Sequence, residues 1–182
     1  MIQFVELWRA HPLNRGETCA CCAPSDTTNA LGQFVRKGEA MYANQAAIRL
    51  GIALNRAGVN LADFGRLQTC GVHAAKDMHI LNPIELANAL DRAGLPGIGR
   101  HETISGADVQ KFYPKLFGRT GIIYIQDYWM RETDPDGRPT GDHIDLWNGY
   151  RSSAKWLMEW FSWAGYYSEY KNAREIWFWE VG

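Results

Sequence analysis

The sequence lacks the features that would place the chain in a membrane or on a nucleic acid. No stretch approaches the roughly 18 consecutive apolar residues that a membrane-spanning helix needs. No run of Lys and Arg occurs, and the net charge is -1 at pH 7. Nucleic-acid-binding domains usually carry a basic excess or stripe. The sequence therefore predicts neither membrane insertion nor a nucleic-acid partner.

Targeting and repeat features are also missing. Residues 1–10 have no positive n-region and no long apolar segment, so we expect no secretory signal there. Export, if it occurs, would use another route. There is no internal repeat and no low-complexity tract. With 182 residues, of which 46% are hydrophobic, the chain is expected to fold as one domain spanning residues 1–182.

Cysteine is sparse. The four cysteines are Cys19, Cys21, Cys22 and Cys70. The arrangement Cys19-x-Cys21-Cys22 is not a standard zinc spacing, so the sequence predicts no metal site. The first three thiols lie in a loop rich in Gly, Pro, Ser and Asp. They are either reduced or joined in one disulfide after export, and the sequence does not choose between the two.

The first two-thirds of the chain carry helical patterns. Apolar residues from Ala47 to Ala57 recur on one face of a helix, with Asn44 as a candidate N-cap and Gly58 as a natural stop. Similar patterns predict three more helices, in residues 4–12, 82–93 and 105–118.

The later part changes to strand patterns. Residues 121–125 are β-branched and aromatic, which predicts a buried strand, and residues 143–147 alternate polar and apolar, which predicts a half-buried one. Residues 176–181 form the last expected strand. Residues 132–140 are expected to be a turn or hairpin loop, and residues 153–163 a helix. Helices first and strands late indicate an α+β fold with an antiparallel sheet.

Two motifs stand out against this background. Residues 44–50 read NQAAIRL at the start of a predicted helix, and residues 141–149 read GDHIDLWNG around a predicted strand. Together they resemble the fourth family of type VI secretion amidase effectors. The resemblance extends to residues 4–12, to the strand at 121–123 and to the aromatic C-terminal strand, which is most of the chain.

The resemblance implies a fold and a function. The fold would be papain-like (NlpC-type), with N-terminal helices packed on an antiparallel sheet. The activity would be a cysteine amidase that cleaves between D-glutamate and meso-diaminopimelate in peptidoglycan stem peptides. The protein would be injected into rival bacteria and act in their periplasm. A cognate immunity protein would be its partner, and neither a cofactor nor a metal is implied.

The family pattern also suggests which residues carry the chemistry. A cysteine amidase needs a thiol at a helix N-terminus, a histidine base and a polar group that orients the imidazole. The family's cysteine is expected at the third position of the first motif, which here is Ala46. His143 is the expected base and Asp145 the expected orienting group. The expected substrate-binding residues are Asn44, Trp147 and Asn148.

An alanine has no thiol, so this chain is expected to be inactive as it stands. Either the cysteine at position 46 was replaced deliberately, or the chain is a naturally inactive homologue. The motif around position 46 is otherwise intact, which favours deliberate replacement. A naturally inactive homologue would be a non-catalytic protein on the same fold that binds peptides or a partner. The codon at position 46 in the source gene discriminates between them.

Several residues have plainer interpretations. Asp145 could be an ordinary polar strand residue, with Asn148 or a residue after the following helix as the third member of the site. Cys19, Cys21 and Cys22 could replace the nucleophile, but no helix starts beneath them. The aromatic segment 153–170 is a candidate surface for the immunity protein. The remaining histidines are treated as ordinary, namely His11, His73, His79 and His101.

Overall fold

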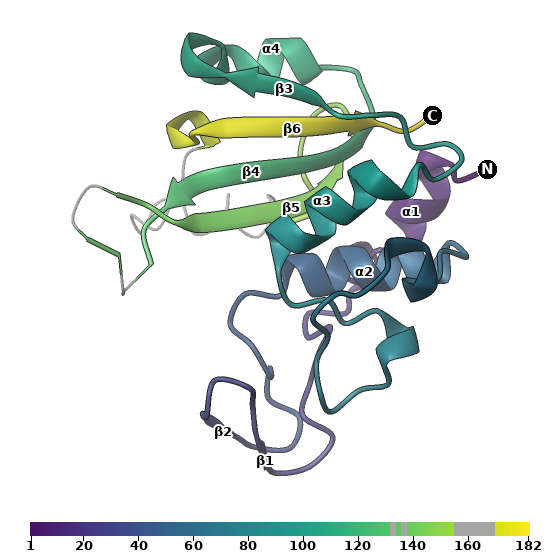
Figure 1. Cartoon of the computed structure of the whole chain (residues 1–182), viewed down its shortest axis with the longest axis vertical. Coiled ribbons are helices and arrows are strands. Elements are labelled where there is room, and N and C mark those ends of the chain that lie inside the picture. Colours follow the sequence, from purple (N-terminus) through teal and green to yellow (C-terminus); the bar gives the residue numbers. More distant parts are fainter. Residues whose placement is uncertain (132–133, 136–137, 155–169) are drawn as a thin grey trace. The chain divides into compact units, whose positions relative to one another are not determined.

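The structure is a computed structural model that describes residues 1–131, 134–135, 138–154 and 170–182. The chain divides into two compact units, Val5–Ala93 and Met1–Phe4 with Gly94–Gly182 (Figure 1). Among the described residues, no helix has the length and apolar character needed to cross a membrane.

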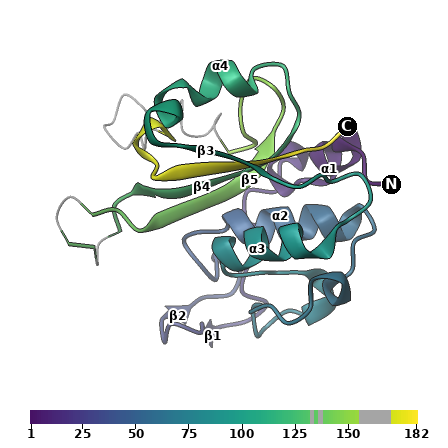
Figure 2. The ribbon, with the colours of Figure 1, turned by 45° about the horizontal axis from the view of Figure 1, so that its top comes forward.

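The unit Val5–Ala93 is mainly helical. Helix α1 spans Phe4–Ala10, α2 spans Ala46–Arg56 and α3 spans Pro83–Ala93. Helices α2 and α3 lie side by side (Figure 2). Long loops connect these helices and contain short 3₁₀ turns. A small antiparallel pair, β1 (Thr27–Thr28) and β2 (Phe34–Val35), lies within the first loop.

Local sequence explains where these helices begin and end. After α2, Gly58 adopts φ +90°, a left-handed conformation that favours glycine, and its N–H bonds to the Asn55 carbonyl. Before α3, the side chain of Asn82 accepts a hydrogen bond from the N–H of Ile84, as an N-cap residue does. Gly94 ends α3 with φ +57°. The predicted helices at 4–12, 44–58 and 82–93 are therefore confirmed to within a turn.

The other unit is built on one antiparallel sheet. Its strands are β3 (Glu102–Ser105), β4 (Gly121–Trp129), β5 (Gly141–Trp147) and β6 (Glu175–Glu180), in the order β3-β6-β4-β5. Between β3 and β4 a 3₁₀ helix (Gly106–Lys111) leads into α4 (Phe112–Leu116). A short 3₁₀ turn, Tyr170–Asn172, precedes β6. An α+β fold with an antiparallel sheet is thus confirmed.

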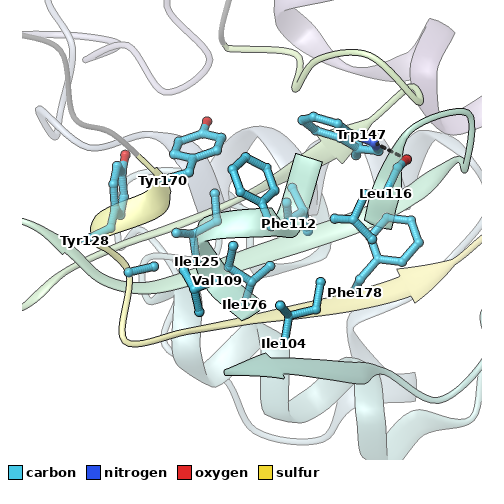
Figure 3. Packing of buried hydrophobic residues seen from close by; sticks show 12 residues of the cluster. Ile104, Val109, Phe112, Leu116, Ile125, Tyr128, Trp147, Tyr170, Ile176 and Phe178 are labelled. Atoms are coloured by element: carbon cyan, nitrogen blue, oxygen red, sulfur yellow. Dashed lines mark hydrogen bonds between the residues drawn. The ribbon is translucent and has the colours of Figure 1, made fainter. Parts of the chain in front are cut away.

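One face of this sheet carries the core of the unit (Figure 3). Ile125 pairs in register with Ile176, and Ile123 with Phe178. These side chains pack against Phe112 and Leu116 of α4. The edge-to-face contact of the Phe112 ring with Trp147 adds to the area buried here.

Some strand predictions need correction. The sequence analysis missed β3, an edge strand with only one buried residue, Ile104. Strand β4 runs four residues beyond the predicted end. Strand β5 was expected to be half-buried but is buried on both faces, because its polar residues His143 and Asp145 are buried too. The expected helix at 153–163 falls almost entirely outside the described residues, as does part of the loop at 132–140.

Candidate active site

Strand β5 presents His143 and Asp145 on the same face of the sheet. His143 is paired in register with Ile125, and Asp145 with Ile123. Both isoleucines point into the hydrophobic core of the unit. Side chains two residues apart in a strand share a face, so the two polar groups lie next to each other at the edge of this core.

The imidazole of His143 is 8% exposed and has a carboxylate beside it. Its Nε2 atom lies 3.4 Å from Oδ2 of Asp145, an ion-pair distance. Nε2 makes no hydrogen bond to any described residue, because the contact lacks hydrogen-bond geometry. The rings of Tyr128 and Tyr170 stand 6.3 Å and 6.2 Å from the imidazole ring. The imidazole therefore lies near two aromatic rings and beside one carboxyl group.

Two backbone amides hold the carboxylate of Asp145. The N–H of Leu146 donates to Oδ1 at 2.8 Å, and the N–H of Ala154 donates to Oδ2 at 2.7 Å. Asp145 is only 2% exposed. A carboxylate fixed by two amides keeps one orientation, which an orienting group for a catalytic imidazole requires. The sequence alone did not indicate the amide of Ala154.

Two tyrosine side chains lie near His143. Burial, followed by the negative charges of Asp145 and Asp142, raises the pKa of Tyr128 well above its ordinary value. The hydroxyl of Tyr170 lies 3.1 Å from Oγ of Ser152, within hydrogen-bond distance. The carboxylate of Asp145 is the acidic side chain that lies within ion-pair distance of the imidazole.

Position 46 is the first residue of α2. Ala46 is 6% exposed, and its backbone N–H donates to Oδ1 of Asn44 at 3.0 Å. A side chain here stands at a helix N-terminus, where the dipole and unpaired N–H groups favour a thiolate. An oxyanion at this amide would have to displace the Asn44 side chain. The sequence analysis did not foresee that competition.

Gln45 anchors the start of α2 to the cysteine loop. Its Oε1 accepts a hydrogen bond from the N–H of Ala20 at 2.8 Å, and its Nε2 donates to the carbonyl of Cys21 at 3.3 Å. The side chain is 3% exposed. Arg49 donates from Nη2 to the carbonyl of Thr18. The loop before α2 is thus tied to the helix start by two polar side chains.

The three expected substrate-binding residues all have structural roles. Asn44 holds the amide of Ala46, as above. Asn148 uses Oδ1 to accept the N–H groups of Tyr150 and Arg151 in a turn. Trp147 is fully buried, and its Nε1–H donates to the carbonyl of Leu116 at 3.0 Å (Figure 3). Their binding of substrate stays a prediction.

All four cysteines lie in the described residues, and none offers a replacement nucleophile. Cys19 and Cys22 are joined by a disulfide. Cys21 and Cys70 are free but buried, at 0% and 1% exposure. Burial, helped by the neighbouring Cys70, raises the pKa of the Cys21 thiol to about 12. A buried thiol that stays protonated is a poor nucleophile.

Comparison with known protein families decides the identity of the chain. The family model for type VI secretion system (T6SS) amidase effector protein 4 matches residues 42–179. The chain belongs to this family. The match includes both motifs, at 44–50 and 141–149, and so confirms the resemblance on which the sequence analysis relied. No curated protein matches the chain.

Membership of this family defines the activity of the chain in broad terms. Amidase effector protein 4 of the type VI secretion system is an antibacterial hydrolase that acts on peptidoglycan and is secreted into target cells. His143, Asp145 and position 46 all lie inside the matched span.

Proposed function

We propose that the chain is a cysteine amidase of peptidoglycan stem peptides in which Ala46 occupies the place of the nucleophile, so that this form is inactive. His143 would be the base, and Asp145 would orient it. The observation that carries the proposal is the family match across both the helix-start motif and the His143 motif. The specific bond would be that between D-glutamate and meso-diaminopimelate.

The chemistry follows from ordinary acyl transfer. With a cysteine at position 46, the sulfur attacks the amide carbonyl carbon after His143 has taken the thiol proton. His143 then gives that proton to the leaving amine, and a thioester remains. Water, deprotonated by the same imidazole, hydrolyses the thioester and releases the acid. Asp145 stabilises the imidazolium that forms in each half-reaction.

Three features of the described residues support this assignment. His143 and Asp145 lie within ion-pair distance of each other on one strand, as a base and its partner would. The residue at 46 starts an eleven-residue helix, the setting that activates a thiol. The other cysteines are buried or oxidised, so position 46 is the natural place for the reactive sulfur.

The remaining parts of the proposal follow from the family resemblance. We propose a papain-like fold that uses residues 1–182 as one domain, action in the periplasm of the target cell, and a cognate immunity protein as partner. The proposed immunity surface, the aromatic segment 153–170, lies almost entirely outside the described residues. Asn44, Trp147 and Asn148 remain the proposed contacts to substrate.

The test compares four forms of the full chain on purified muropeptides, with products identified by mass spectrometry. The Ala46→Cys variant is expected to cut the stem peptide at the D-glutamyl–meso-diaminopimelate bond. The parent chain, the Ala46→Ser variant and the Ala46→Cys/His143→Ala double variant are expected to show no cleavage above background. An Ala46→Cys variant that folds but releases no product contradicts the proposal.

The alternative is a non-catalytic peptide-binding or partner-binding protein, which the missing thiol at position 46 favours. It predicts that the parent chain binds muropeptides or a partner protein, and that Ala46→Cys adds no activity. Calorimetric titration of the parent chain with intact muropeptides, alongside the cleavage assay, separates the two functions.

A further inference from the structure

A second cluster of reactive side chains lies in the unit Val5–Ala93, and the proposed chemistry does not use it. The Sγ atoms of Cys21 and Cys70 are 3.4 Å apart. Nδ1 of His73 lies 3.5 Å from each of these sulfurs. Three metal-ligating atoms therefore face one point, although their parent residues are up to 52 positions apart in the chain.

We propose that Cys21, Cys70 and His73 bind a zinc ion. In tetrahedral zinc sites the metal lies about 2.3 Å from sulfur and about 2.0–2.1 Å from imidazole nitrogen. Tetrahedral angles at those lengths give sulfur–sulfur separations of about 3.8 Å and sulfur–nitrogen separations of about 3.6 Å. The observed separations are within a few tenths of an ångström of these values.

The triangle of ligand atoms also has the right size. Its three sides place the centre about 2.0 Å from every ligand atom, slightly less than the zinc bond lengths. An ion would therefore sit just above the plane of the three atoms. The fourth tetrahedral position would point away from them, toward water or another small donor.

The position of His73 argues for a metal over a simple disulfide. A disulfide between Cys21 and Cys70 would need only the two sulfurs. Here the imidazole nitrogen is equidistant from both sulfurs. The ring of His79 stacks on that of His73, with centroids 4.2 Å apart, which limits rotation of the ligand. A metal site needs such outer contacts to fix its histidine.

The location suggests what the ion does. Cys21 and Cys70 belong to a buried cluster that also contains Ile48 and Ile52 of α2. Cys21 lies in the loop between α1 and α2, and Cys70 in the loop between α2 and α3. A zinc ion would join both loops to each other beside α2. Because the three ligands come together only in the folded chain, the free energy of metal binding would add to the stability of the folded state.

The test uses the reduced full-length parent chain and does not depend on activity. After incubation with zinc and dialysis, elemental analysis is expected to find one zinc per chain. Cobalt is expected to give the intense thiolate-to-cobalt absorption and the visible bands of a tetrahedral complex. Zinc is expected to raise the thermal unfolding midpoint. The absence of the thiolate band, or a disulfide between Cys21 and Cys70 that excludes zinc after mild reduction, overturns the proposal.

Variants distinguish this site from adventitious binding. The His73→Ala variant is expected to lose at least about tenfold in zinc affinity, and His73→Cys to retain the metal with a shifted cobalt spectrum. The Cys19→Ser/Cys22→Ser double variant is the matched control and is expected to bind zinc like the parent. If the double variant loses zinc while His73→Ala keeps it, the ligand set proposed here is wrong. Far-ultraviolet circular dichroism verifies that each variant folds.

Discussion

Oδ2 of Asp145 lies 3.4 Å from Nε2 of His143 and also accepts the N–H of Ala154 at 2.7 Å. One carboxylate oxygen thus contacts both the imidazole and the turn that follows β5. Because the other oxygen accepts the N–H of Leu146, the carboxylate cannot rotate without breaking a backbone hydrogen bond. The stability of this turn and the orientation of the His143 imidazole are therefore linked through the Asp145 side chain.

Replacing Asp145 tests that link. An Asp145→Asn variant keeps one acceptor oxygen but turns the other into an NH₂ group, which faces a backbone N–H. One buried donor is left unsatisfied, so the free energy of unfolding should fall by about 1–3 kcal/mol. Urea denaturation measures the loss. Asp108→Asn, which removes an exposed partner of Lys115, is the control and should leave the midpoint unchanged. Equal midpoints for the two variants would contradict the assigned role.

A substitution at Trp147 distinguishes a role in core packing from a role in substrate binding. A Trp147→Phe change removes the Nε1–H that Leu116 accepts and leaves a small cavity in the core. The expected destabilisation is about 2–4 kcal/mol. Trp177→Phe is the control, because Trp177 is less buried and donates to the side chain of Glu175. In the Ala46→Cys background, a Trp147→Phe variant with normal stability but a raised KM would favour the substrate role instead.

Gly51 is required by a close approach of two backbone segments. An added β-carbon would overlap the carbonyl oxygen of Met78 and lie 3.3 Å from Cδ1 of Ile80. Alanine improves helix propensity by about 1 kcal/mol, but this clash costs more. The Gly51→Ala variant should be less stable by about 1–3 kcal/mol in thermal or urea unfolding. Gly71→Ala, whose β-carbon would meet no atom, should be close to neutral; a stabilised Gly51→Ala would refute the overlap.

Asp142 gives a prediction for pH dependence. Burial raises the pKa of its carboxyl above the ordinary value of 3.8 in the folded state, despite a hydrogen bond from the N–H of Asp127. Between pH 3.8 and the pKa of Asp142 in the folded state, the folded chain binds more protons than the unfolded chain. The free energy of unfolding therefore falls as the pH rises through this window. The Asp142→Asn variant should lack this dependence of stability on pH. At neutral pH it should be more stable than the parent chain. Unfolding midpoints measured from pH 3.5 upward check the difference, and parallel curves for the two proteins would exclude it.

The sequence predicted the elements that local patterns determine. Helices α2 and α3 each have a clear apolar face, and strand β5 was predicted from its alternation of polar and apolar residues. Asn82 caps α3, whereas the N-cap of α2 is Gln45, without a side-chain cap bond, and not the candidate Asn44. Strand β3 was missed because one buried residue, Ile104, carries no pattern of its own. The half-buried prediction for β5 failed because His143 and Asp145 are buried through their polar contacts, which no alternation rule anticipates.

Long-range contacts were the least predictable from sequence. The amide of Ala154 on Asp145 comes from a turn nine residues away and has no sequence pattern. The cluster of Cys21, Cys70 and His73 joins distant loops, and its one local trace is the spacing of Cys70 and His73 around a tight turn. A single Cys-x-x-His pair predicts no site by itself, because the remaining ligand, Cys21, comes from a distant loop. The hydrogen bond from Ala46 to Asn44 likewise appears only once the backbone is known.

The thiol reactivity of the Ala46→Cys variant tests the central claim most directly, namely that position 46 and His143 serve one reaction. The rate of alkylation by iodoacetamide is measured against pH, with the parent chain as background for its buried thiols. If the claim holds, the introduced thiol reacts at a pH well below the ordinary cysteine pKa of about 8.5, and adding His143→Ala moves the profile back toward that value. Identical profiles with and without His143 would contradict the account.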